Sequence, residues 1–164
     1  MRVLPSLLLL LTALPFAANA AGAITVPKKL SFQKDAHIPD AVRKECGLEE
    51  KTAEAVRNVL TGKFDKVESA DNVSAKTPGK ALELRIAAVL APGGGPFSGP
   101  KSLTLTGTLW ENGKALGNFT AGRYTTRGHG TCGMLERNAK EIAQDIAKWI
   151  TAPSKDALLG DAKK

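Results

Sequence analysis

The chain has 164 residues, and its 23 Lys and Arg against 16 Asp and Glu give a formal net charge of +7 at pH 7. This basic balance favours anionic partners such as lipid headgroups or acidic polymers, although a positive charge also simply keeps a protein soluble. Aromatic residues make up 5% of the sequence and no basic run is interleaved with them, which argues against nucleic acid as a partner.

Residues 1–20 have the three parts of a secretory signal peptide. Arg2 gives the positive start, leucines at 7–11 form the apolar core, and Ala18-Asn19-Ala20 supplies the small residues that a signal peptidase reads. A membrane anchor is the alternative, but the apolar run falls short of the about 20 residues that span a bilayer. No Cys lies near the cleavage site and no later stretch reaches transmembrane length. We therefore expect a mature protein released into a bacterial periplasm, or a secreted one.

The first half of the mature chain mixes strand signals with one helix. Pro27 marks an edge strand, and the alternation of Leu82, Leu84 and Ile86 with polar residues is typical of a half-buried strand. In chain order we expect a strand over 24–32, one or two helical turns over 38–46, a helix over 48–60, and strands over 64–73 and 82–90.

The second half contains the clearest patterns. Leucines alternate with Ser and Thr over 102–109, and Asn112-Gly113 then predicts a tight hairpin turn, because both residues accept positive φ. A return strand is expected over 115–126. Apolar residues recur at helical spacing up to Ile150, so a last helix is predicted before Pro153, with 154–164 as a flexible tail.

These elements predict one α+β domain over residues 21–153, in the order β-α-β-β-β-β-α. The sheet is expected to be mainly antiparallel, with two helices packed on one face. Residues 92–100, rich in Gly and Pro, could cradle phosphate, but no Lys-Ser or Lys-Thr pair closes a Walker motif there, and no helix is expected to follow. A connection between two strands is the favoured interpretation.

Two cysteines remain in the mature chain, Cys46 and Cys132. An even number in an exported protein predicts a disulfide, here between the start of the first long helix and the start of the last one. The alternative is a thiol nucleophile at Cys132, with His129 three residues before it. His37 and His129 are the only histidines, which argues against a metal site built on His clusters, and no cofactor is expected.

The stretch from Ser98 to Ile150 resembles small uncharacterised bacterial periplasmic proteins with a domain of one sheet and two helices. The residues that carry the resemblance are Trp110-Glu111-Asn112-Gly113-Lys114 and the run from Gly130 to Arg137, together with Glu45-Cys46-Gly47-Leu48. The resemblance implies a periplasmic setting and a layered fold. It transfers no catalytic residue, and this chain lacks the lipid-attachment Cys of some relatives.

Arg123, Arg127 and His129 form the local basic group that precedes the last helix, whose N-terminus favours anions. They are a candidate anion site, with ordinary solvated charge as the alternative. The leading functional hypothesis is a non-enzymatic domain that binds an envelope protein or an anionic envelope component. The alternatives are a thiol-dependent enzyme that uses Cys132 and His129, and a protein that binds anions or phospholipid headgroups.

Overall fold

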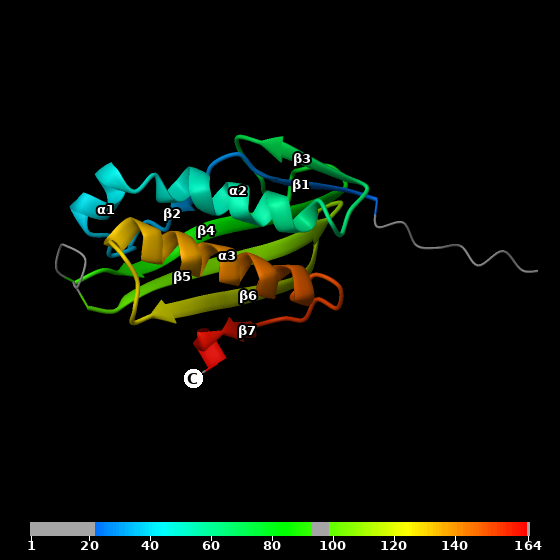
Figure 1. Cartoon of the computed structure of the whole chain (residues 1–164). Coiled ribbons are helices and arrows are strands. Elements are labelled where there is room, and N and C mark those ends of the chain that lie inside the picture. The colour runs from blue at the N-terminus through cyan, green and yellow to red at the C-terminus, as the bar shows by residue number, and fades with distance from the viewer. Residues whose placement is uncertain (1–21, 93–98, 164) are drawn as a thin grey trace, which may run out of the picture.

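The computed structural model describes residues 22–92 and 99–163, which form one seven-stranded sheet with three α-helices and a short 3-10 helix (Figure 1). The strands lie in the order β3-β1-β4-β5-β6-β7, and β2 pairs with β4. The bounds are β1 Ala23–Pro27, β2 Ser31–Phe32, α1 Asp40–Glu45, α2 Leu48–Leu60, β3 Lys66–Ala70, β4 Lys80–Leu90, β5 Lys101–Glu111, β6 Lys114–Thr125, α3 Thr131–Trp149, β7 Ala157–Gly160 and η1 Asp161–Lys163. The predicted signal peptide lies outside the described residues, as do residues 93–98 of the predicted loop.

The centre of the sheet is the antiparallel meander of β4, β5 and β6. Leu105 lies opposite Ile86 on one side and Ala121 on the other, so the buried positions of the three strands share one face. Asn112 and Gly113 have φ of 50° and 84°, as the hairpin between β5 and β6 requires. The predicted meander and hairpin are confirmed.

The sheet as a whole is mixed, which corrects the prediction of a mainly antiparallel one. β1 runs parallel to β3 and β4, β2 runs parallel to β4, and β7 runs parallel to β6. The cause is the helices: α1 and α2 lie between β2 and β3, and α3 lies between β6 and β7. A helical crossover returns the chain to the end of the sheet from which it left, so the next strand can run parallel.

The last residues also differ from the expected flexible tail over 154–164. Ala157–Gly160 form β7, which pairs with Phe119–Gly122 of β6, and Leu159 is only 9% exposed. The backbone N–H of Tyr124 donates to a carboxylate oxygen of Asp161 at 3.1 Å. A short apolar segment placed directly after a crossover helix therefore completes the sheet beyond residue 153.

The helices lie on one face of the sheet, and α1 stands at the end of α2 as a third helix (Figure 1). The core between the two layers contains Leu103 and Leu105 of β5 and Ile142 and Ile146 of α3, all fully buried. The ring of Phe119 packs closely against the backbone of Gly107, where a Cβ would lie 2.5 Å from that ring. None of the described helices has both the length and the apolar character needed to cross a bilayer.

The other face of the sheet is free of helices over the described residues (Figure 1). Alternation along β5 places Thr104, Thr106 and Thr108 on it, half-buried, opposite in direction to the leucines of the core. Among residues 22–92 and 99–163, the large apolar side chains that are exposed are Leu90, Tyr124 and Leu158, at 51%, 49% and 50%.

Candidate binding groove

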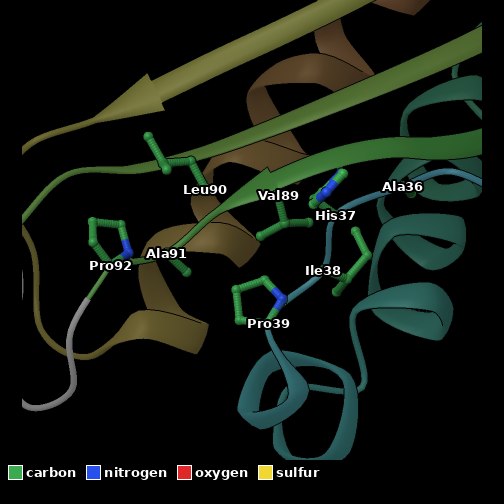
Figure 2. A pocket seen from close by; sticks show the side chains of 8 residues that line it. All are labelled: Ala36, His37, Ile38, Pro39, Val89, Leu90, Ala91 and Pro92. Carbon is green, nitrogen blue, oxygen red and sulfur yellow. The ribbon is translucent and has the colours of Figure 1, made fainter.

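An apolar groove of about 570 Å³ lies where β4 ends, between that strand and the segment that leads into α1 (Figure 2). Its walls are short apolar side chains with one histidine: Ala36, His37, Ile38, Pro39, Val89, Leu90, Ala91 and Pro92. In Figure 2, Val89 and Ala91 are directed toward Ile38 and Pro39, whereas Leu90 projects from the opposite side of the strand and forms the rim. The groove can therefore receive an apolar side chain.

Beyond Ile86, the edge of β4 beside this groove has no paired strand in the described part of the chain. β5 occupies the other edge along the whole strand, while on this edge β1 pairs at Lys80 and Ala81, and β2 pairs at Arg85 and Ile86. The last backbone hydrogen bond here runs from the N–H of Gln33 to the carbonyl of Ile86, at 2.8 Å. Beyond it, the chain from Ala36 to Pro39 lines the groove without forming a strand.

A second hollow of about 350 Å³ adjoins the groove and shares Pro39 and Ala91 with it. Its far wall contains the disulfide between Cys46 and Cys132, whose Cα atoms are 5.1 Å apart. The predicted disulfide is confirmed, and no cysteine of the described chain is free. With its sulfur bonded to Cys46, Cys132 has no thiolate to act as a nucleophile, and the bond fixes the start of α3 beside α1.

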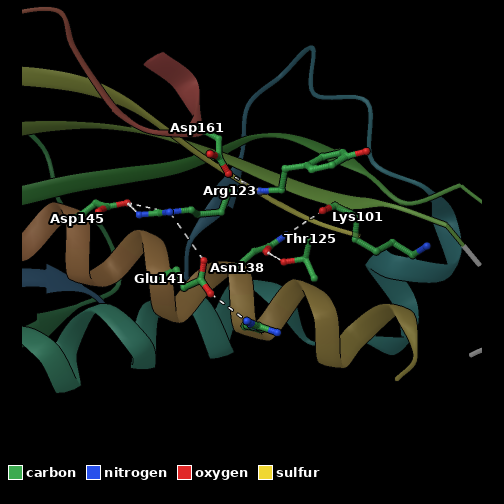
Figure 3. Close-up of polar contacts among 9 residues, drawn as sticks. Lys101, Arg123, Thr125, Asn138, Glu141, Asp145 and Asp161 are labelled. Atoms are coloured by element: carbon green, nitrogen blue, oxygen red, sulfur yellow. Dashed lines mark hydrogen bonds and ion pairs between the residues drawn. The ribbon is translucent and has the colours of Figure 1, made fainter. Parts of the chain in front are cut away.

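Lys101 fixes the far end of the groove, although its side chain is fully buried. Its ammonium group donates to the carbonyls of Pro92, at 3.1 Å, and Gly99, at 3.0 Å. Its own carbonyl accepts from the Asn138 amide at 3.0 Å, and the Thr125 hydroxyl donates to the Asn138 side-chain oxygen (Figure 3). A buried charge is tolerated only when it is hydrogen-bonded, so this lysine holds together the two described ends of the Gly-rich loop.

Of the predicted basic group, Arg123 is paired with acidic side chains of α3. Arg123 faces α3 and donates through Nε to Asp145 at 2.9 Å, and its guanidinium lies 3.9 Å from Glu141 (Figure 3). Asp145 lies about 20 Å along α3 from its first residue, at 1.5 Å per residue, so the Arg123 charge is neutralised far from the helix N-terminus. Arg127 and His129 are exposed in the loop before α3, where an anion site remains a prediction.

The groove residues were not identified from the sequence as a site. Residues 36–39 and 89–92 are about 50 positions apart, and each is an ordinary apolar stretch. The available signal was the end of the alternating pattern at Val89-Leu90 directly before a Pro- and Gly-rich loop. Within the described residues, no cluster of three His, Cys, Asp or Glu side chains could hold a metal ion.

No protein-family model matches the chain, and no curated protein matches it either. Solved structures of similar arrangement include the PelC dodecamer from Paraburkholderia phytofirmans, at 16% identity and a TM-score of 0.49, covering 80% of this chain and 92% of that one. A homolog of a neuraminyllactose-binding hemagglutinin from Helicobacter pylori has 12% identity, a TM-score of 0.47, and coverage of 82% and 84%. A minor lipoprotein from Acinetobacter baumannii has 15% identity, a TM-score of 0.40, and coverage of 81% and 92%. Likeness at this level assigns no ligand, partner or compartment to this chain.

Proposed function

We propose that this is an exported, non-enzymatic binding domain that holds an extended segment of another envelope protein in the groove at the end of β4. One observation carries the proposal: an apolar groove lies directly beside a strand edge that β2 leaves after Ile86. An extended peptide added to a sheet edge gains affinity from main-chain hydrogen bonds and specificity from pockets that receive alternate side chains.

The chemistry of the groove favours a peptide over a charged ligand. Ile38, Pro39, Val89 and Ala91 offer apolar contact, and among the described residues that line the groove only His37 has an ionisable side chain. The adjoining hollow lengthens the apolar surface past Pro39 toward the disulfide, as an extended chain of several residues requires. The signal peptide predicted over residues 1–20 supports an envelope setting for the partner.

A site-specific photo-crosslinker at position 90 tests the proposal in intact cells. Leu90 is 51% exposed on the groove rim, and Leu158 is 50% exposed on β7, away from the groove, so the two positions are matched in accessibility. We expect a discrete adduct with one envelope protein from position 90 and not from position 158. Mapping should place the crosslink in an extended segment with apolar residues at alternate positions.

A substitution in the groove wall distinguishes binding in the groove from nonspecific contact with the protein surface. Ala91→Arg places a long charged side chain in the wall shared by the two hollows and should abolish the position-90 adduct, while Leu158→Arg should leave it unchanged. Identical adducts from positions 90 and 158, or an adduct that survives Ala91→Arg, would contradict the proposal. An adduct with a second copy of this chain would show that the groove mediates self-association and would contradict the proposed envelope partner.

A further inference from the structure

The helix-free face of the sheet contains a polar hollow, which is separate from the groove and from the hollow that adjoins the groove. It has a volume of about 280 Å³ and lies over the middle of β4, β5 and β6. Seven polar side chains line it: Gln33, Glu83, Arg85, Thr106, Thr108, Asn118 and Thr120. Ligand pockets usually have about 300–1,000 Å³. This hollow is thus sized for one small unit.

Strand register fixes the positions of these side chains. Glu83, Thr108 and Asn118 lie opposite one another in one row across the three strands, and Arg85 and Thr120 flank Thr106 in the next. Residues paired across antiparallel strands have Cβ atoms about 4.5–5.5 Å apart, so neighbouring polar groups in a row can contact the same small molecule.

Two sides of the hollow, at Glu83 and at Asn118, are also held by hydrogen bonds within the protein. The Glu83 carboxylate accepts from the Trp110 indole N–H and from Arg85, both at 3.0 Å. The Asn118 side chain forms a reciprocal pair with Asp156: its amide donates to the carboxylate at 2.9 Å, and its oxygen accepts from the backbone N–H at 3.1 Å. The site is therefore preorganised before any ligand arrives, which lowers the entropic cost of binding.

Hydrogen-bonding capacity remains on the ligand side. Among the described residues, the hydroxyls of Thr108 and Thr120 have no protein partner, and the amide of Gln33 has one, the Thr106 hydroxyl at 2.8 Å. Each hydroxyl can both donate and accept. Because the charges of Glu83 and Arg85 cancel in their ion pair, the hollow favours neither anions nor cations.

These features define the ligand chemistry. A neutral molecule with several hydroxyl groups matches donors and acceptors that alternate over a small area, and Trp110, one position along the same face, adds an apolar aromatic surface. We propose that the polar hollow binds one neutral pyranose unit of a saccharide. This site lies on a different face from the peptide groove and does not depend on the function proposed for it.

Titration of the isotope-labelled protein, followed by amide and indole N–H resonances, tests the proposal with three probes: glucose, galactose and N-acetylglucosamine. We expect a saturable shift of the Trp110 indole N–H and of the backbone amides around Thr108 with at least one probe, in the millimolar range. Absence of any saturable shift with all three, or shifts that map to another face, would overturn the proposal.

Two matched variants make the mapping decisive. Thr108→Val keeps the side-chain shape and removes one hydroxyl of the hollow, so the dissociation constant should rise about 5-fold, the effect of one ordinary hydrogen bond. Thr104→Val makes the same change on the same strand and face, outside the hollow, and should have no effect. Equal weakening in both variants would show that the sugar contacts the sheet face generally and would refute the assigned site.

Discussion

Removal of the disulfide should cost this protein a large part of its stability. The bond joins residues 86 positions apart, Cys46 at the end of α1 and Cys132 in the first turn of α3. A cross-link of that span removes about 15 cal/mol/K of chain entropy from the unfolded state, which corresponds to about 4–5 kcal/mol at 25 °C. Small domains have only about 5–15 kcal/mol of net stability.

The assay is urea unfolding of the Cys46→Ala/Cys132→Ala variant, with the wild type in reductant as the matched control. Both should lose about 4–5 kcal/mol, because both lose the same cross-link. Alkylation should add two groups to the wild type after reduction and none before it. A loss of about 1 kcal/mol or less, as in an ordinary surface substitution, would refute the claim that the bond stabilises by restricting the unfolded chain.

Three further predictions, one of them with a matched control substitution, probe single contacts by urea unfolding or NMR. Gly107→Ala should lower the free energy of unfolding by about 1–3 kcal/mol, because the new Cβ would lie 2.5 Å from an aromatic ring. Gly133→Ala in α3, where the space at the Cβ is open, should instead raise it by up to about 1 kcal/mol. Equal effects of the two substitutions would contradict the packing described. Asn138→Ala should lower the free energy of unfolding by about 2–4 kcal/mol, because the Lys101 carbonyl and the Thr125 hydroxyl each lose a buried hydrogen bond to Asn138. A loss below about 0.5 kcal/mol would show that water replaces the Asn138 side chain. Lys29→Met should raise the pKa of Glu50, because the Lys29 ammonium lowers this pKa through a hydrogen bond, and carboxyl chemical shifts measured against pH would detect the change. The stability that this pair contributes is present above the ordinary carboxyl pKa and is lost as the pH falls through the lowered pKa of Glu50.

The sequence predicted those elements whose signals are local. The alternation along β5, the Asn112-Gly113 turn and the apolar stripe of α3 each lie within a few residues, and each is confirmed. The disulfide could also be predicted, because the chain has only two cysteines and the signal peptide indicates an oxidising compartment. Short-range periodicity and counting were sufficient for these features.

The parallel pairings required information that no local pattern holds. β2 has two residues and β7 has four, too few to show alternation, and their partners lie in distant parts of the chain. Arg123 shows the same limit for a site. Its proximity in sequence to Arg127 predicted a common charge cluster, but the strand directs Arg123 toward α3, where Asp145 neutralises it.

The short outer strands have a consequence for how the chain avoids self-association. β4, β5 and β6 are 11, 11 and 12 residues long, and strands of that length with bare edges are templates for aggregation. The sheet ends instead in β3, whose five residues include the Lys66–Glu68 ion pair, and in β7, whose four residues end at Gly160. Loss of the last eight residues would uncover β6 along Phe119–Gly122. A chain shortened in this way should precipitate or form fibrils even though its three α-helices and the meander of β4, β5 and β6 remain in place.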